Sequence, residues 1–515
     1  MKLDYKKTIF VGFAFFLICA FWQAYDTIIP KILTDKFGMP HSLSGVIMAL
    51  DNVLALFLLP LFGTLSDKCE SKRGRRTPYI IFGTVLAAVF IVVLSFADGM
   101  QLKALKDVTP ANPAAQEVLY DANLDILTPT GDKINIQEKF SKEEFTAIPA
   151  KNEDGKTNLD YTNFVVPARQ AFARAVTSHN KTPLIIFIAI LLVILVSMAT
   201  FRSPAVALMP DVTIKPLRSK ANAIINLMGS AGGIIVLVLG MVFGTGKSQN
   251  ALMNYTSFFI TIASVMLVAL TVFLIKVKEP KLVAEMHEES VRFGIDDGSG
   301  SESEENGDKK DGLTVAERKS LILILASVVL WFFGYNAVIS KYSVYASSVL
   351  NLDYNLTLTI ATAAAILAYI PVGMVASKIG RKRTIIAGII ILFASFFGAS
   401  FIRAGSPVMV MNVLFITAGI GWATINVNSY PMVVELSKSN NVGRYTGFYY
   451  TASMAAQIAT PMLSGLIIDK FGMTTLFPYG FIFVIAALFT MIFVMHGDNK
   501  PTPQKSKLEA FDSAD

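Results

Sequence analysis

Charged side chains are scarce in this sequence. Asp, Glu, Lys and Arg make up 16% of its 515 residues, whereas they make up about a quarter of a typical soluble protein. Hydrophobic residues make up 53%, and they fall in runs long enough to cross a bilayer as a helix, which takes about 20 residues. The shortage of charge therefore excludes an ordinary soluble domain and predicts a multi-pass membrane protein.

Cysteine and histidine are also rare. The two cysteines, Cys19 and Cys69, offer no disulfide framework and no metal-ligand spacing. The apolar runs contain no histidine cluster, no nucleophile–base arrangement and no phosphate-binding loop. We therefore expect a protein that is not an enzyme and that has no metal and no cofactor. The net charge of +7 implies no nucleic acid partner, because basic cytoplasmic loops of membrane proteins account for it.

The apolar runs predict twelve transmembrane helices in an all-α protein. Each run is long enough to satisfy its backbone hydrogen bonds internally as a helix in lipid. The predicted spans are 8–30, 43–66, 78–97, 183–204, 220–244, 252–276, 319–341, 357–377, 383–403, 407–430, 443–467 and 474–496.

Two long polar segments interrupt these runs. Residues 98–182 contain turn signals such as "KNEDGKTN" and predict an extracellular insert between the third and fourth helices. Residues 277–318 contain the acidic, Gly- and Ser-rich "DDGSGSESEENGDKKD" and predict a flexible cytoplasmic linker. The linker separates an N-terminal six-helix bundle (1–276) from a C-terminal one (319–498), and a cytoplasmic tail (499–515) follows.

The basic residues predict the orientation of the chain. Seventeen Lys and Arg fall in the N-terminal segment and in alternate short loops, and six fall in the opposite short loops. Basic loops face the cytoplasm. We therefore expect both termini in the cytoplasm, and we expect a monomer in the lipid bilayer of the plasma membrane.

A basic loop motif recurs in the two halves. "GTLSDKCESKRGRRTP" (63–78) follows the second predicted helix, and a partial copy, "GMVASKIGRKRT" (373–384), follows the eighth. Membrane topology explains the sign of the charge, but it does not explain the Gly-x-x-x-Asp spacing or the Gly-Arg-Arg. Asp67 at a helix end can accept charge-assisted hydrogen bonds from Arg75 or from a helix N-terminus. We predict a cytoplasmic gate that includes Asp67, Arg75 and Arg76 and that forms in one conformation and breaks in another.

A second pair of loops contains an acid followed by an arginine. Asp211 and Arg218 follow the fourth predicted helix, and Glu435 and Arg444 follow the tenth. Matched halves of this kind are typical of transporters built from repeats around a central site. We assign these two pairs to the same cytoplasmic gate.

The first loop motif resembles the signature of the major facilitator superfamily, and the twelve-helix plan agrees over nearly the whole chain. Its longer form, "SDKCESKRGRRTP", resembles the glycoside–cation symporters and the related sucrose carriers. So do "GMPHSLSG" (38–45), "FRSPAVALMPDV" (201–212) and "GRYTGFYYTASMAAQIATPMLSG" (443–465). The resemblance implies two pseudo-symmetric six-helix bundles, a sugar substrate and a role for His41 at the outer mouth.

The sequence departs from that branch at two sites. Melibiose-type symporters have two acids before the second-helix proline that help bind sodium, and Ala55 and Leu59 occupy those positions here. Arg202 stands where those symporters have a fourth-helix Asp, so we expect a proton rather than sodium. Sucrose carriers have an arginine where this chain has Val206, and Arg202 lies one turn earlier on roughly the same helix face.

Three charged residues lie well inside predicted spans, away from their ends, where charge is costly and usually faces the bundle interior: Asp26, Asp51 and Arg202. An aspartate whose arginine partner alternates with substrate would couple a proton to sugar movement. We predict Asp26 or Asp51 as the proton carrier and Arg202 as its partner. A permanent structural ion pair is the alternative.

Aromatic and amide side chains in the predicted helices are candidates for sugar binding, because rings cover C–H surfaces and amides bond hydroxyls. "FWQAYD" (21–26) offers both kinds one turn apart. Interfacial aromatics and helix-bridging amides are the alternative. The candidates are Trp22, Gln23, Tyr25, Asn226, Tyr335, Asn336, Asn426, Asn428 and Gln457.

These features together predict a secondary active transporter that imports a disaccharide or other glycoside with a proton, by rocking two six-helix bundles. A sugar uniporter or exporter of the same fold is one alternative. A transporter-like nutrient sensor that binds sugar without flux is the other.

Overall fold

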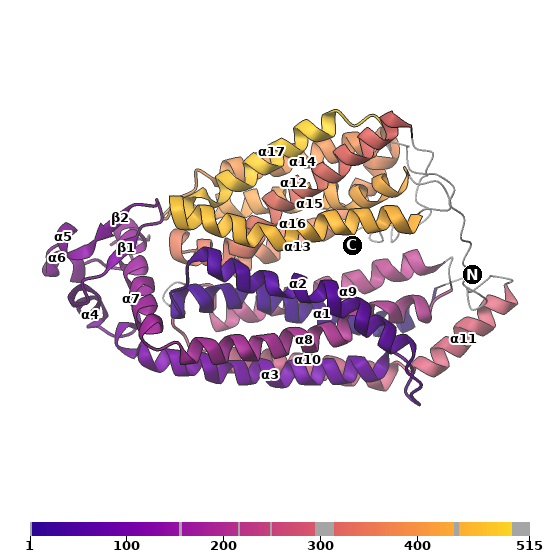
Figure 1. Ribbon diagram of the computed structural model, residues 1–515, viewed down its shortest axis with the longest axis horizontal. Helices are drawn as coiled ribbons and strands as arrows, with labels where there is room; N and C mark the ends of the chain where they lie inside the picture. The colour runs from indigo at the N-terminus through magenta and orange to yellow at the C-terminus, as the bar shows by residue number, and fades with distance from the viewer. Residues whose placement is uncertain are drawn as a thin grey trace.

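The computed structural model describes residues 3–153, 157–214, 217–247, 250–293, 314–436 and 442–496. Twelve long helices form the body of this described part, and they confirm the twelve predicted spans (Figure 1). The N-terminal half contains α1 (Tyr5–Lys31), α2 (His41–Asp67), α3 (Thr77–Ala104), α8 (Thr182–Asp211), α9 (Arg218–Phe243) and α10 (Thr256–Lys276). The C-terminal half contains α12 (Val315–Tyr345), α13 (Tyr354–Ile379), α14 (Arg381–Ala399), α15 (Val408–Val434), α16 (Val442–Phe471) and α17 (Leu476–Ile492).

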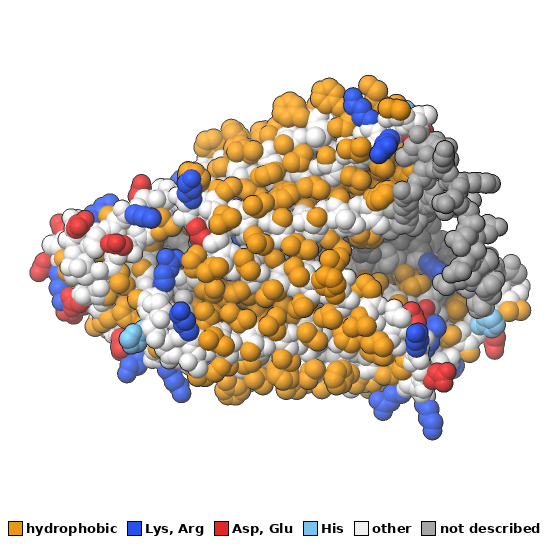
Figure 2. Space-filling model, in the orientation of Figure 1, with side chains coloured by type: hydrophobic (Ala, Val, Ile, Leu, Met, Phe, Trp, Pro, Cys, Tyr) orange, Lys and Arg blue, Asp and Glu red, His pale blue; other side chains and the backbone are white. Residues whose placement is uncertain are grey.

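The helices have the length and composition of membrane spans. Eleven of those in the described residues are long and apolar enough to cross a bilayer, and α13 contains a shorter apolar run, Tyr354–Tyr369. Hydrophobic side chains cover the face of the molecule across the helices, while charged side chains gather at the two ends (Figure 2). This distribution places the helices in the hydrocarbon layer, where each backbone satisfies its own hydrogen bonds. The chain is a multi-pass membrane protein.

Each half has its own apolar core. One cluster of buried side chains joins α1, α2, α3, α8, α9 and α10. A second cluster joins the helices of the C-terminal half and includes only Leu237 from the first half. Because each half packs around its own centre, one half can move against the other without opening either core.

The insert between α3 and α8 is folded. It contains α4 (Ala115–Asp121), the antiparallel strands β1 (Asp125–Leu127) and β2 (Lys133–Asn135), α5 (Ile136–Lys139), α6 (Lys142–Thr146) and α7 (Val166–His179). α3 extends to Ala104, so the insert begins later than residue 98. Its buried side chains, such as Leu119, Phe145 and Phe164, form a third core. It caps one end of the helices (Figure 1), called the insert end below; the opposite end is called the far end.

The structure corrects the prediction of a flexible linker over 277–318. The first part of that segment forms α11 (Glu279–Arg292), which begins with a buried glutamate, Glu279. At the other end, α12 begins at Val315 with a capping box between Thr314 and Glu317. The acidic stretch between these two helices lies outside the described residues.

Candidate functional site

A cavity of about 750 Å³ lies midway along the helices, between the two halves. α1, α2, α8 and α9 contribute to its wall from one half, and α12, α13, α15 and α16 contribute from the other. Two side chains in the wall, Leu227 and Tyr450, are 41% and 42% exposed. The cavity is therefore open to its surroundings, and its shape depends on how the two halves are placed.

The charged part of the cavity belongs to the N-terminal half. Trp22 and Asp26 lie one turn apart on α1 and both contribute to the wall, as does Arg202 of α8. The Arg202 guanidinium lies over the Trp22 ring, 5.5 Å from its centre. Among the described side chains, no carboxylate oxygen lies within 4.0 Å of that guanidinium, although Asp26 and Asp51 act on its charge from farther away. The predicted ion pair is therefore not closed in this conformation.

Asp51 lies beside the cavity. Its neighbour Asn52 contributes to the wall and donates a hydrogen bond to the Asp51 carboxylate over 3.0 Å. Of the two predicted proton carriers, the structure thus places Asp26 in the wall of the cavity, and Asp51 is hydrogen-bonded to a residue of that wall, Asn52.

The opposite wall contains an aromatic stack that sequence reasoning missed. The indole of Trp422 on α15 contributes to the wall, and the Tyr335 ring stacks flat against it at 3.6 Å with an interplanar angle of 2°. Phe332 meets the same indole edge-on at 5.2 Å. The signal in the sequence was the spacing from Trp422 to Asn426, which repeats the spacing from Trp22 to Asp26 and puts each pair on one helix face.

The predicted sugar-binding residues divide into two groups. Trp22, Gln23, Asn226, Asn426 and Gln457 line the cavity. The other four do not: Tyr25, Tyr335, Asn336 and Asn428.

Each of these four corrections has a physical reason. Tyr25 is buried against Phe21 and Trp22. Tyr335 backs Trp422, as described above. Asn428 donates to the Thr424 carbonyl oxygen of its own helix at 3.0 Å. Asn336 follows Tyr335 on α12 and turns to a different face, and its amide nitrogen has no hydrogen-bond partner among the described residues.

Hydrogen bonds join the two halves at the insert end. The Asp469 carboxylate of α16 accepts from the backbone N–H groups of His41 and Ser42 at 2.7 and 2.8 Å, and so caps the start of α2. Lys341 is buried and donates to the His41 carbonyl oxygen at 2.8 Å. On α1, Lys31 donates to the Ser347 hydroxyl at 2.7 Å. These contacts, called the seal below, close the insert end in this conformation.

His41 lies in the seal, as expected for a residue at a mouth between the halves. Its side chain lines a second cavity of about 370 Å³, which the insert and both halves enclose. Asp469 and Arg174 line the same space.

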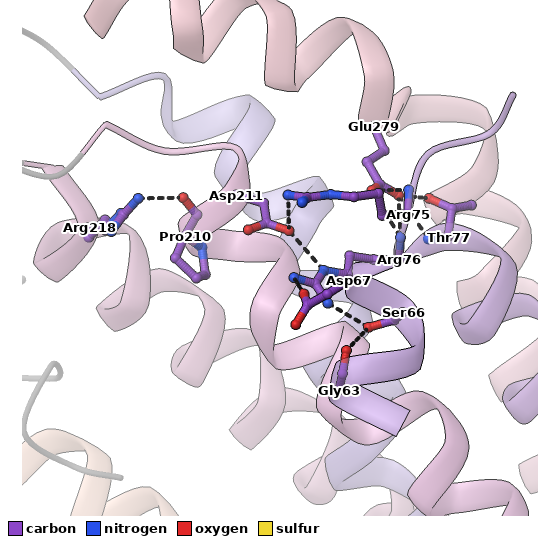
Figure 3. A network of polar contacts seen from close by, with 10 residues as sticks. All are labelled: Gly63, Ser66, Asp67, Arg75, Arg76, Thr77, Pro210, Asp211, Arg218 and Glu279. Carbon is purple, nitrogen blue, oxygen red and sulfur yellow. Dashed lines mark hydrogen bonds and ion pairs between the residues drawn. The ribbon is translucent and has the colours of Figure 1, made fainter. Parts of the chain in front are cut away.

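The basic loop motif at the far end forms a charge network inside the N-terminal half (Figure 3). The Arg76 guanidinium contacts Asp67 at 2.5 Å and Asp211 at 2.8 Å, and Arg75 contacts Asp211 at 3.4 Å. Burial alone would lower the pKa of Arg76, but its hydrogen bond and attraction to Asp211, together with Asp67, raise that pKa above its ordinary value. The predicted partner of Asp67 is therefore corrected from Arg75 to Arg76.

Glu279 of α11 completes this network. Its carboxylate accepts hydrogen bonds from the backbone N–H groups of Arg75, Arg76 and Thr77 at 2.7 to 3.1 Å, and from the Thr77 hydroxyl at 2.7 Å. It therefore supplies negative charge and acceptors at the N-terminus of α3 (Figure 3). Because sequence reasoning placed this residue in a flexible linker, it missed this role.

One of the two predicted acid–arginine pairs, Asp211 with Arg218, is also corrected. Arg218 donates to the carbonyl oxygens of Pro210 and Thr213 rather than to the side chain of Asp211. In the C-terminal half, Glu435 pairs with Arg381 of the second loop motif at 3.0 Å.

The side chain of Arg444 lies outside the described part of the chain, so its pairing with Glu435 stays a prediction. At the far end, the ion pairs of Arg76 with Asp67 and Asp211, and of Arg381 with Glu435, each join helices of one half. In this conformation each of these ion pairs stabilises one half and does not link it to the other.

Family models match most of the chain. The model described as Major Facilitator Superfamily matches residues 170–427 and 351–513. The model described as MFS/sugar transport protein matches residues 10–105.

Similar proteins match either a short stretch or the fold. The sucrose transport protein SUT3 of Oryza sativa subsp. indica is 35% identical over 75 residues, which span 15% of this chain and 15% of that protein. The xylose transporter XylE from E. coli in its inward open conformation covers 98% of this chain and 99% of its own, with a TM-score of 0.55 and 14% identity. The structure of a D-xylose-proton symporter covers 96% and 99%, with a TM-score of 0.55 and 14% identity.

The solved structures support the fold, and the family models extend over both halves. This protein belongs to the major facilitator superfamily, a family of transporters.

Proposed function

We propose that this protein is a secondary active transporter that imports a disaccharide or other glycoside together with a proton. The observation that carries the proposal is the cavity of about 750 Å³, which both halves share and whose wall contains Asp26, Arg202 and two tryptophans. A site at the interface of two repeats is what alternating access requires. The matched relatives include a sucrose transport protein and a xylose transporter, whose names agree with a sugar substrate.

The two walls of the cavity suit the two surfaces of a sugar. Trp22 and Trp422 each contribute an indole, and an indole packs against the C–H face of a pyranose. The side-chain amides in the wall can donate to and accept from hydroxyl groups at the same time: Gln23, Asn226, Asn426 and Gln457.

We propose that Asp26 carries the proton. It is the aspartate of the cavity wall, and the Arg202 guanidinium beside it is engaged by the Trp22 ring rather than by a carboxylate. A guanidinium in this position can bind a sugar hydroxyl when Asp26 is protonated and return toward Asp26 when the proton leaves. A sodium site is less well supported than a proton site, because the side chains of Ala55 and Leu59 offer no oxygen ligands to the cavity.

We further propose that both termini lie in the cytoplasm of a plasma-membrane protein, with the insert outside. In that orientation the seal closes the outer mouth, and the cavity faces the cytoplasm. The two described charge networks then brace the cytoplasmic ends of the halves. We propose a monomer as the working unit.

The test is uptake into proteoliposomes over a panel of labelled glycosides, with and without a pH gradient. For the accepted sugar, Asp26→Asn is expected to abolish uphill uptake driven by the pH gradient and to retain counterflow exchange, which needs no net proton movement. Asp51→Asn is the matched control, and we expect it to retain part of the uphill uptake.

Other outcomes separate the alternatives. Counterflow without any response to a pH gradient in the wild-type protein would indicate a uniporter. Sugar binding without flux would indicate a sensor. Full proton-driven uptake by Asp26→Asn would contradict the role of this aspartate.

A further inference from the structure

The insert is attached firmly to the N-terminal half. Gln170 on α7 donates to the Asp35 carboxylate beyond the end of α1 at 3.0 Å. Arg174, one turn further along α7, donates to the Gly38 carbonyl oxygen at 3.0 Å. Gln101 of α3 donates to the Thr177 hydroxyl at 2.9 Å. With a core of its own and these anchors, the insert moves as part of the N-terminal half.

The same insert also contacts the C-terminal half. In the turn between β1 and β2, the Pro129 carbonyl oxygen accepts a hydrogen bond from the backbone N–H of Thr474 at 3.0 Å. The side-chain amide of Asn351, between α12 and α13, donates to the Thr157 hydroxyl at 3.0 Å. Two parts of the insert that are distant in sequence therefore contact two separate loops of the other half.

The contact at the β-turn is close. Gly131 and Gly472 both have positive φ angles, +94° and +87°. A Cβ atom built on Gly131 would lie 2.6 Å from the carbonyl carbon of Phe471, which is inside van der Waals contact. The two backbones approach each other as only glycine allows.

We propose that the insert is a clamp that spans the outer mouth and holds it closed through the Pro129–Thr474 and Thr157–Asn351 contacts. The proposal rests on the proposed function, since it assumes that the halves separate at the insert end during transport. An element attached to one half cannot keep these contacts when the other half tilts away. The clamp therefore adds stability to the conformation in which the seal is closed, and loosening it shifts the population toward the outward-open one.

Cys19 is a natural reporter of that population. It lines the central cavity, so a membrane-impermeant maleimide applied from the insert side reaches it only when the seal opens. A Cys69→Ser background removes the other thiol. The labelling rate in intact cells then measures the outward-open fraction.

Two matched pairs of variants test the clamp. Thr157→Val removes the acceptor for Asn351 and keeps the side-chain shape, and its control is Thr146→Val, whose hydroxyl bonds only within the insert. Gly131→Ala places a methyl group against the C-terminal half. Its control is Gly405→Ala, which has the same kind of backbone strain at φ +86°, and whose Cβ would meet only the Thr157 carbonyl oxygen at 3.9 Å, an ordinary van der Waals distance.

We expect Thr157→Val to raise the labelling rate about fivefold, the effect of one lost hydrogen bond, and Gly131→Ala to raise it at least as much. The two controls are expected to leave it unchanged. A positive control, Lys341→Met, breaks the seal itself. Faster labelling in Lys341→Met but not in Thr157→Val and Gly131→Ala would overturn the clamp alone, whereas no labelling in any variant would overturn alternating access and the clamp with it.

Discussion

At the scale of single residues, the cavity wall contains two tryptophans, one from each half. Trp22 contacts the cation of Arg202, and Trp422 is held flat by Tyr335. The indole of Trp422 is therefore fixed in one orientation before any sugar arrives. A ring that is held in place in advance loses little conformational entropy on binding.

Replacing Trp422 by alanine should raise the KM for the transported glycoside about tenfold, which corresponds to roughly 1.4 kcal/mol. The variant loses the sugar-facing ring and frees Tyr335 to move. Uptake kinetics in proteoliposomes measure the effect. Trp422→Phe, which keeps an aromatic face, should retain most of the affinity, and an unchanged KM in Trp422→Ala would show that sugar does not contact this wall.

At the scale of elements, α11 holds the start of α3 in place. Glu279 is 2% exposed and accepts hydrogen bonds from the three consecutive backbone N–H groups of Arg75, Arg76 and Thr77. The loop motif therefore does more than place positive charge at the far end. It connects α2, α3, α8 and α11 through Arg76 and Glu279 into one unit.

Glu279→Gln should lower the free energy of unfolding by about 2 kcal/mol, because an amide has one acceptor oxygen and leaves buried donors unsatisfied. Thermal unfolding in detergent is the measurement. The control is Glu285→Gln on the same helix, which loses exposed ion pairs to Lys7 and Lys281 and should cost far less. Equal melting temperatures for the two variants would argue against the capping role.

At the scale of the whole molecule, the insert end closes because helices of the two halves approach very closely. A Cβ built on Gly465 of α16 would collide with the His41 carbonyl at the start of α2, and one on Gly45 would collide with the Pro461 carbonyl. Because the helices pack this closely, backbone N–H groups at the start of α2 can donate hydrogen bonds directly to the Asp469 carboxylate. The seal thus depends on the absence of side chains as much as on charge.

Gly465→Ala should keep the halves apart at the insert end, so that Cys19 reacts faster from that side and net uptake slows. Gly447→Ala is a matched control on the same helix, because a Cβ there meets no atom within 4 Å. It should transport normally, since alanine favours a helix over glycine. Normal uptake and labelling in Gly465→Ala would show that the approach of α2 and α16 is not needed for closure.

The twelve helices were predictable because each is a separate physical unit. A run of about 20 apolar residues forms a helix in lipid whatever its neighbours do, since its backbone has no other hydrogen-bond partners. The same rule explains why the sequence did not predict helix α11. That helix lies outside the membrane spans and depends on Glu279 reaching the start of α3, a contact between residues about 200 positions apart.

The candidate site was predictable only in part. Trp22 and Asp26 could be assigned to one helix face from their spacing, but the same kind of reasoning placed Asn428 in a wall that it does not reach. Periodicity tells which residues share a face, and the rotation of each helix against its neighbours decides which face meets the cavity.

The sequence by itself determined how many times this protein crosses the membrane and which residue types the spans contain, because both follow from the local balance of apolar burial and backbone hydrogen bonding. Only the tertiary structure decided that Arg76 joins Asp67 to Asp211, that Trp422 and Trp22 line one cavity, and that the insert reaches the C-terminal half. Each of these features brings together segments that are distant in sequence. It depends on how whole helices pack and rotate against one another rather than on any local sequence pattern.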